Sequence, residues 1–265
     1  MKVLLVNPIT NSRFVRENRD GVPYPLGIGY IGAFLQSNGH DVTILDNNQK
    51  CYDRQKLTQF LKESEAEIVG ISAMVNCYNQ VIQLYRLIKE TIDVPVVLGG
   101  PMATYSPDIV LKNMDIDICV MGEGEETAVE LFSNWPDFKT IKGIAYIDNN
   151  YEYVRNPSRI FNKTRDEYPY PGYDDLLDIT KYWRGTLVTW EPPAHIINPK
   201  LTSSYRKLTH PGFKIGTMLT AMGCPYKCTF CTTSTEFMKT RVRSPSNVAE
   251  EAFYLKDRFG IEGIR

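Results

Sequence analysis

The chain has 265 residues, a formal net charge of −1 and an apolar fraction of 43%, enough sequence for one large domain or two ordinary ones around a packed core. The near-neutral charge gives no support for electrostatic capture of nucleic acid or of acidic membranes. The longest apolar runs, such as Val3–Val6 and Val94–Leu98, are far too short to span a bilayer, and Asn7-Pro8 ends the first run too early for a signal peptide. We therefore expect a cytoplasmic protein with no membrane span and no nucleic-acid partner.

The first half of the chain alternates short apolar runs with segments of helical periodicity. In chain order these predict a strand at Lys2–Asn7, a helix at Leu26–Asn38, a strand at Val42–Leu45, a helix marked by Leu57, Phe60 and Leu61, a strand at Ile68–Ser72, a helix at Tyr78–Thr91, a strand at Val94–Leu98, a helix from Ser106 through Asn113, a strand at Ile116–Val120, a helix at Glu125–Phe132 and a hairpin of Gly143–Ile147 with Tyr151–Val154. This alternation is typical of an α/β fold in which a doubly wound parallel sheet is covered by helices on both faces.

Glycine and polar residues follow the predicted strands at their carboxyl ends. These positions are Asn7, Ser72, Gly99-Gly100 and Met121-Gly122-Glu123-Gly124. Ligands of open parallel sheets bind at the carboxyl ends of the strands near the topological switch point, and glycine lets a ligand approach the backbone closely. Tight turns alone would also explain Gly99-Gly100, but glycines at the ends of neighbouring strands favour a ligand site.

The composition changes after the hairpin. Residues 155–213 are rich in proline, keep tryptophan and tyrosine, and show little periodicity, which is typical of a packed connector between domains. A third segment begins with a predicted strand at Lys214–Ala221 and continues with a helix at Ser244–Phe259 that Gly260 ends. Gly263-Ile264-Arg265 reads as the start of another strand.

The six cysteines are too few for a disulfide scaffold and are unevenly placed. Three are scattered, whereas Cys224, Cys228 and Cys231 form a C-x-x-x-C-x-x-C motif that follows a predicted strand. A loop can wrap three thiolates around a small cluster, which a regular helix or strand cannot do. Because [4Fe–4S] clusters are usually held by four cysteines, three would leave one iron open to chelate a substrate or cofactor.

A structural zinc site is the alternative for these cysteines. Such sites use four ligands, commonly as two spaced pairs. None of His40, His195 and His210 has paired spacing with the cysteines, although His210 is near enough in sequence to reach them. Zinc therefore stays open as a second interpretation.

The cysteine motif, with Phe230 before its last cysteine and Gly223-Cys224-Pro225 at its start, resembles the signature of radical S-adenosylmethionine enzymes. The first half of the chain is similar to the cobalamin-binding domain of one large class of these enzymes. The stretches that carry the likeness are Pro25–Gly32, Leu98–Pro101, Met121–Glu125, the connector stretch Asp166–Leu177, and Arg243-Ser244-Pro245 with the following helix. The resemblance covers nearly the whole chain.

The resemblance implies three parts. Residues 1–154 would form a Rossmann-like cobalamin-binding domain, residues 155–213 an interdomain connector, and residues 214–265 the first β/α unit of an incomplete partial (β/α)6 barrel. The later barrel elements that hold S-adenosylmethionine are missing. We therefore expect a chain truncated within the radical S-adenosylmethionine domain and inactive by itself.

The resemblance also implies a cluster site. Cys224, Cys228 and Cys231 would ligate a [4Fe–4S] cluster whose open iron binds S-adenosylmethionine through its amino and carboxylate groups. One-electron reduction would then cleave S-adenosylmethionine to a 5′-deoxyadenosyl radical, while the protein positions the groups and excludes water. Phe230 would shield the cluster near the adenine, unless it packs as an ordinary aromatic.

Cobalamin would lie across the strand ends of the first domain. Ser72 and Met74 would line its nucleotide tail, with Gly99 and Gly100 beside it. The other expected pocket residues are Asn7, Gly122 and Glu123. The Asp-x-His-x-x-Gly element that supplies a lower histidine ligand in other cobalamin proteins is absent, so we expect no protein histidine on cobalt.

Several charged residues have a simpler interpretation. Glu125 is expected to interact favourably with the positive end of the following helix rather than to act in catalysis. Lys239, Arg241 and Arg243 form a basic run that reads as solvated surface, with a functional role as the alternative.

The resemblance implies the N-terminal part of a cobalamin-dependent radical S-adenosylmethionine enzyme that transfers methyl groups to unactivated carbon. A radical cyclase or rearrangement enzyme is one alternative, and a non-catalytic cobalamin-binding fragment is another. An enzyme of this kind would need a small-molecule substrate and an external electron donor such as flavodoxin or ferredoxin. The sequence identifies neither the substrate nor a catalytic side chain.

Overall fold

The computed structural model describes residues 1–10, 22–160, 164–182, 214–232 and 240–264. Its centre is a seven-stranded sheet of order β2-β1-β3-β4-β5-β6-β7. The strands are β1 (Lys2–Asn7), β2 (Asp41–Asp46), β3 (Ile68–Ser72), β4 (Val96–Gly99), β5 (Ile118–Val120), β6 (Ile144–Ile147) and β7 (Tyr153–Arg155). The first five pair in parallel, whereas β6 and β7 are antiparallel, which confirms both the predicted parallel sheet and its closing hairpin.

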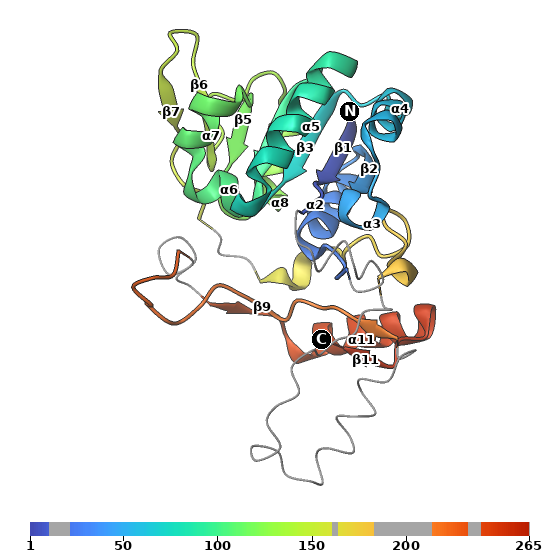
Figure 1. Ribbon diagram of the computed structural model, residues 1–265. Coiled ribbons are helices and arrows are strands. Elements are labelled where there is room, and N and C mark those ends of the chain that lie inside the picture. The colour runs from blue at the N-terminus through green and yellow to red at the C-terminus, as the bar shows by residue number, and fades with distance from the viewer. Residues whose placement is uncertain (11–21, 161–163, 183–213, 233–239, 265) are drawn as a thin grey trace, which may run out of the picture.

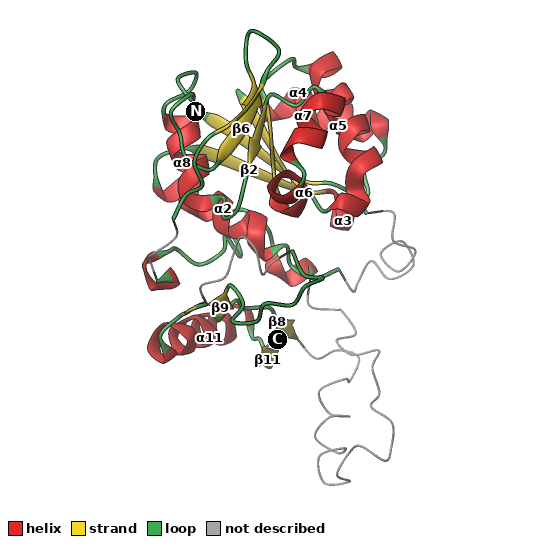
Figure 2. Cartoon of the chain, turned by 90° about the vertical axis from the view of Figure 1, so that its left-hand side faces the viewer, coloured by secondary structure: helices red, strands yellow, loops and turns green. Residues whose placement is uncertain are grey.

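Helices cover both faces of the sheet (Figure 2). The helices of this part are α2 (Leu26–Ser37), α3 (Asn47–Lys50), α4 (Arg54–Ser64), α5 (Tyr78–Thr91), α6 (Gly100–Tyr105), α7 (Pro107–Met114) and α8 (Glu125–Ser133). Helices α2 and α8 pack on one face, and α4 to α7 pack on the other, so that the sheet separates two apolar cores. The predicted doubly wound α/β architecture is therefore confirmed.

The order of the strands places a topological switch point next to β1. Strand β1 lies between β2 and β3, so the chain adds β2 on one side of β1 and then β3 on the other side. The carboxyl ends of β1, β3, β4 and β5 all face the C-terminal segment, which lies below the sheet in Figure 1. This edge is where a doubly wound sheet binds ligands.

The C-terminal segment contains β8 (Ile215–Gly216), β9 (Ala221–Met222), β10 (Arg241–Val242), α11 (Pro245–Phe259) and β11 (Gly263–Ile264). The prediction of one strand at Lys214–Ala221 is wrong, because β8 and β9 are separate and belong to different ladders. Strand β8 pairs in parallel with β11, and β9 pairs antiparallel with β10. Between them, the carbonyls of Leu219 and Thr220 accept hydrogen bonds from Arg243, the residue that follows β10.

The predicted helix at Ser244–Phe259 is confirmed as α11, which the Ser244 side chain caps and Gly260 ends in a left-handed conformation. With β8 and β11 it forms a parallel β/α/β arrangement, as expected of a first barrel unit. The barrel itself stays a prediction.

The described part of the connector packs between the sheet domain and the C-terminal segment. It holds two short 3₁₀ turns, η3 (Arg165–Glu167) and η4 (Ile179–Lys181). Its buried Tyr173 and Tyr182 join the same apolar core as α2 and α8, and Leu255 of α11 joins that core from the other side. The predicted connector residues 183–213 lie outside the described residues.

Candidate functional site

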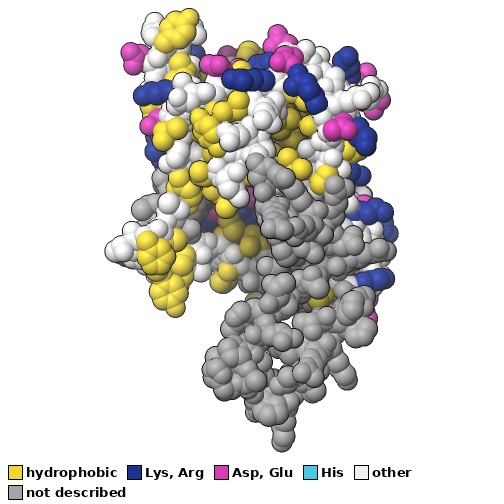
Figure 3. Space-filling view, viewed as in Figure 1, with side chains coloured by type: hydrophobic (Ala, Val, Ile, Leu, Met, Phe, Trp, Pro, Cys, Tyr) yellow, Lys and Arg dark blue, Asp and Glu magenta, His cyan; other side chains and the backbone are white. Residues whose placement is uncertain are grey.

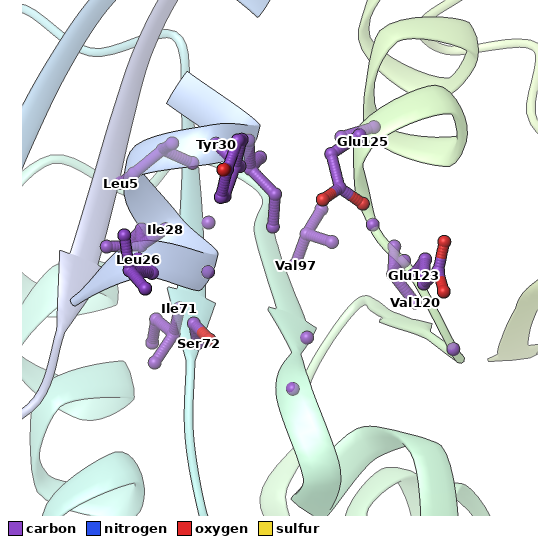
Figure 4. A pocket seen from close by; sticks show the side chains of 18 of the residues that line it. Leu5, Leu26, Ile28, Tyr30, Ile71, Ser72, Val97, Val120, Glu123 and Glu125 are labelled. Carbon is purple, nitrogen blue, oxygen red and sulfur yellow. The ribbon is translucent and has the colours of Figure 1, made fainter. Parts of the chain in front are cut away.

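A cavity of about 360 Å³ lies between the sheet and helices α2 and α8 (Figure 4). Its walls come from four parallel strands, the three helices α2, α6 and α8, the connector and the C-terminal segment. The lining residues include Leu5, Tyr30, Gly70, Ser72, Val97, Gly99, Gly100, Gly122, Glu123, Glu125, Arg165, Leu219 and Met222. The wall is mostly apolar with a few polar groups, which is the usual composition of a small-molecule or cofactor pocket.

Glycine keeps this cavity open within the sheet. Gly70 pairs with Leu5 of β1 and with Val97 of β4, so it lies in the middle of the sheet face that α2 and α8 cover. A Cβ at Gly70 would lie 2.7 Å from Cδ2 of Leu5, which also lines the cavity. A side chain at position 70 would therefore displace Leu5. At the end of β4, Gly100 has a φ of +81°, and a Cβ there would meet the backbone of Ala73 at 2.9 Å. Gly99 and Gly100, two of the glycines predicted to allow close approach of a ligand, thus line this cavity.

Two carboxylates lie at the rim of the cavity, and each is bound by arginine. Glu123 precedes α8 and accepts hydrogen bonds from both terminal nitrogens of Arg241, one of them at 3.0 Å. Glu125, in the first turn of α8, accepts from Arg165 Nη2 at 2.6 Å. The exposed fractions of these four side chains run from 3% to 10%, so the charges are paired in a buried setting.

These pairs revise two expectations. Glu125 does lie in the first turn of α8, where the helix dipole favours a carboxylate, but it also binds an arginine of the connector. The prediction that Arg241 and Arg243 are solvated surface is wrong, since both are buried in ion pairs, Arg243 with Glu251 of α11. Lys239 lies outside the described residues.

The predicted cofactor-binding residues, seven for cobalamin and Phe230 for the cluster, divide into two groups. Ser72, Gly99, Gly100, Gly122 and Glu123 all line the cavity, and their contact with cobalamin stays a prediction. Three others lie elsewhere in the part of the chain that the structure describes. Asn7 donates a hydrogen bond to Asp46 Oδ1 at 2.9 Å and so ties the ends of β1 and β2, while Met74 and Phe230 are exposed and do not contribute to the cavity wall.

The cysteine motif lies on the segment between β9 and β10. Cys224 and Cys231 are half-buried, and Cys228 is exposed. The segment projects to one side of the molecule, where Figure 3 shows hydrophobic side chains at the surface, and Tyr226 and Phe230 are exposed by 71% and 89%. Across the described ranges, no three His, Cys, Asp or Glu side chains gather closely enough to hold a metal ion. The structure therefore does not bring the three thiols to a common point.

The other cysteines are in different surroundings. Cys119 lies in β5, where burial raises the pKa of its thiol to about 12. Burial also raises the pKa of the Cys77 thiol, although a backbone hydrogen bond from Met74 opposes the shift. Both therefore stay protonated near neutral pH, whereas thiolates are the form that ligates metal.

Histidine ligation of cobalt stays untested. His40 lies at the amino end of β2, with its Nε2 3.1 Å from Ser133 Oγ, at the opposite edge of the sheet from the cavity. His195 and His210 lie outside the described residues. None of the helices in the described part of the chain is long and apolar enough to cross a membrane.

Sequence reasoning missed several residues of the site. Tyr30 and Arg165 line the cavity, and Leu219 and Met222 cover it from the C-terminal segment. Tyr30 lies within Pro25–Gly32, and Arg165 directly precedes Asp166–Leu177, two stretches that carry the family likeness. No local sequence pattern there distinguishes a cavity residue from a core residue.

Comparison with known proteins agrees with this geometry. Residues 12–132 match the family model described as B12 binding domain. An uncharacterized methyltransferase of Pyrococcus horikoshii is 33% identical over all of this chain and 52% of its own length. Cytidylyl-2-hydroxyethylphosphonate methyltransferase of Streptomyces wedmorensis is 31% identical over 98% of this chain and 53% of its own length. The chain thus spans about half the length of these curated relatives.

A further relative is named for a different activity. Anaerobic magnesium-protoporphyrin IX monomethyl ester cyclase of Rubrivivax gelatinosus is 27% identical over 95% of this chain and 42% of its own length. The likeness to methyltransferases therefore extends to a cyclase.

Two solved structures share the fold. The radical S-adenosylmethionine methyltransferase TsrM of Kitasatospora setae superposes with a TM-score of 0.69 at 20% identity, over 99% of this chain and 46% of that chain. The cobalamin-dependent S-adenosylmethionine radical enzyme OxsB gives a TM-score of 0.72 at 21% identity, over 98% of this chain and 32% of that chain. Residues 12–132 therefore match a B12 binding domain, the chain shares the fold of these two proteins, and its resemblance to cobalamin-binding radical S-adenosylmethionine proteins is confirmed.

Proposed function

We propose that this chain is the N-terminal part of a cobalamin-dependent radical S-adenosylmethionine enzyme, most simply a methyltransferase that acts on an unactivated carbon of a small molecule. The observation that carries the proposal is the cavity at the carboxyl ends of β3, β4 and β5, covered by Leu219 and Met222 just before the cysteine motif begins. One part of the molecule can thus hold a large cofactor while the adjoining segment supplies three thiols.

The walls of the cavity support cobalamin as its ligand. Gly70, Gly99 and Gly100 line the cavity without side chains, so that a ligand would meet backbone at these positions. Ser72 and Gly122 would line the same insertion path. The apolar surfaces of α2 and α8 would exclude water from it.

The donor set of the motif fits an iron–sulfur cluster. Cys224, Cys228 and Cys231 would supply three thiolates from one loop, and Phe230 would cover them. When bound, the cluster and S-adenosylmethionine supply one-electron chemistry, and cobalamin carries the methyl group. This chain's own contribution is to hold the loop beside the cavity, through the pairing of β9 with β10 and of Glu123 with Arg241.

A cyclase or another radical rearrangement enzyme is the second candidate. It is favoured by the Rubrivivax relative, which is named a cyclase and matches 95% of this chain. Either activity would require an external electron donor such as flavodoxin or ferredoxin, and an enzyme of this kind would work in the cytoplasm. A non-catalytic cobalamin-binding protein and a zinc protein are the outcomes that the experiment must separate from both.

Anaerobic reconstitution with iron, sulfide and hydroxocobalamin tests the proposal. We expect a [4Fe–4S] absorption and EPR spectrum in the wild type and none in a variant with Cys224, Cys228 and Cys231 changed to alanine. Changing the scattered Cys51, Cys77 and Cys119 to serine one at a time is the matched control and should leave the spectrum intact. Stoichiometric zinc without iron uptake would overturn the enzyme assignment. Cobalamin binding without a cluster would leave only a binding protein.

A further inference from the structure

Arg165 is a buried arginine with donors that nothing in the described structure uses. It lies in the connector turn η3, is 6% exposed and forms part of the cavity wall. Its Nη2 donates to Glu125, and Glu123 Oε2 lies 3.9 Å from the same nitrogen. Its Nε and Nη1 are buried and have no hydrogen-bond partner among the described residues. The charge of Arg165 is thus compensated by Glu125, but its Nε and Nη1 donors have no acceptor among the described residues.

The setting of Arg165 fixes its orientation. The guanidinium carbon lies 5.0 Å from the ring centre of Tyr30 and 5.3 Å from that of Tyr168, within the range of cation–π contacts. The side chain is therefore held by two rings and a carboxylate. Rotating Nε and Nη1 of Arg165 toward solvent would break the contacts with the two rings and with Glu125.

Tyr30, on the same wall of the cavity, carries a second buried donor. The hydroxyl of Tyr30 is buried and also lacks a partner among the described residues, and Tyr30 lines the cavity (Figure 4). Leaving a buried polar group unpaired destabilises the folded protein, and the effect is larger for a charged group. Two such groups beside one cavity indicate that a ligand with oxygen acceptors completes them.

We infer that Arg165, assisted by Tyr30, is a cofactor-binding residue that donates hydrogen bonds to an oxygen acceptor of the cobalamin in this cavity. The inference rests on the proposed function, since it takes cobalamin as the ligand. Cobalamin offers two sources of such acceptors, the amide carbonyls around the corrin ring and the phosphate of the nucleotide tail. Arginine is suited to both, and charge-assisted hydrogen bonds to phosphate are the stronger.

Titration of the whole 265-residue chain with hydroxocobalamin, followed by absorbance, tests this. Arg165→Lys keeps a positive charge opposite Glu125 but loses the planar set of donors. We expect it to weaken binding about tenfold, the equivalent of about one charge-assisted hydrogen bond. Arg159→Lys is the matched control, because Arg159 also pairs with α8 carboxylates, including Glu130, yet does not line the cavity.

Repeating the titration with cobinamide, which lacks the nucleotide tail and its phosphate, separates the two acceptors. A loss for cobalamin alone places Arg165 on the phosphate, and an equal loss for both ligands places it on a corrin amide. Unchanged affinity for both in a folded Arg165→Lys protein overturns the inference while leaving the proposed function standing. A wild-type chain that binds no cobalamin overturns both.

Tyr30→Phe keeps the test decisive if Arg165→Lys fails to fold. It removes only a hydroxyl that has no described partner and keeps the ring against Arg165, so the fold should persist. We expect a several-fold weaker affinity for cobalamin. An affinity equal to that of the wild type would overturn the inference in that case.

Discussion

Glu123 and Arg241 lie 118 residues apart in the sequence and form a two-pronged ion pair at the rim of the cavity. Glu123 belongs to the sheet domain, whereas Arg241 begins β10, immediately across the ladder from Met222 of β9. The cysteine motif occupies the chain between these two strands. A carboxylate at the cavity rim therefore anchors the base of the cysteine-bearing segment, and its side chain is only 3% exposed.

Breaking this pair should destabilise the fold. In Glu123→Gln, the side chain of Arg241 loses the carboxylate that compensates its charge, and removing one partner of a buried pair costs about 3–5 kcal/mol. We expect a clearly lower midpoint of urea unfolding and faster proteolysis of the cysteine segment. Glu90→Gln, which breaks an exposed pair with Arg54, is the control and should change neither. Equal midpoints for wild type and Glu123→Gln would show that the pair does not anchor the segment.

Filling the cavity from within the sheet should weaken ligand binding. The new Cβ in Gly70→Ala would lie 2.7 Å from Leu5 Cδ2 and push that side chain into the cavity. Overpacking costs about 1–3 kcal/mol, so we expect about tenfold weaker cobalamin affinity in an equilibrium titration.

Gly32→Ala controls for overpacking alone. Its Cβ would lie 2.7 Å from Ile44 Cδ1, an equally close contact on the same side of the sheet, but Gly32 does not line the cavity. It should lose stability without losing affinity. If both variants bound cobalamin like the wild type, the ligand would have to sit elsewhere.

Asp46 should make stability depend on pH. Burial raises its pKa above the ordinary value, against the opposing effect of hydrogen bonds from Tyr182, Asn7 and the backbone. The unfolded chain therefore ionises first, near pH 3.9, and the folded protein loses stability as the pH rises from there through the raised pKa.

Asp46→Asn should remove this loss, because an amide oxygen can still accept from the Asn48 backbone and from Asn7. In urea unfolding from pH 4 to 9, we expect the free energy of unfolding of the variant to rise relative to that of the wild type as the pH rises. Asp53→Asn, at the exposed cap of α4, controls for the change of a capping carboxylate. If the free energy of unfolding of the wild type rose relative to that of Asp46→Asn with rising pH, the raised pKa of Asp46 would be contradicted.

Tyr173 joins the connector to α11. Its hydroxyl donates to Glu251 Oε1 at 2.5 Å, and Glu251 is fully buried beside Arg243. Tyr173→Phe should cost about 1–3 kcal/mol, because it removes a donor from a buried carboxylate. Hydrogen exchange should then increase in α11 more than in the sheet. Tyr151→Phe, at a tyrosine that is 90% exposed, should change nothing, and a uniform response across the molecule would argue against a local role for Tyr173.

The first half of the fold could be predicted because its order is local. The strands and helices up to the hairpin follow periodicities of a few residues, and each of the five predicted parallel strands exists with small shifts at its ends. Helix α6 was missed, because Gly99-Gly100-Pro101 reads as a turn, although Pro is also well suited to a first helical turn.

The C-terminal segment and the rim of the site depend on distant contacts. The apolar run at Lys214–Ala221 predicts one strand, but its two ends pair with different strands, β8 with β11 and β9 with β10. Arg165 and Glu125 are 40 residues apart, so no local pattern joins them. The cavity glycines at strand ends were predictable, whereas the arginines that face them were not.

Glu123 and Glu125 are separated by one residue, yet they hold arginines from two different segments of the chain. The charges sum to zero within each pair, Glu123 with Arg241 and Glu125 with Arg165. A substitution at position 123, 125, 165 or 241 that changes one charge leaves an odd buried charge behind, which the rest of the apolar surroundings cannot neutralise. These four positions should therefore evolve together, so that related chains either keep all four charges or replace them in complementary pairs.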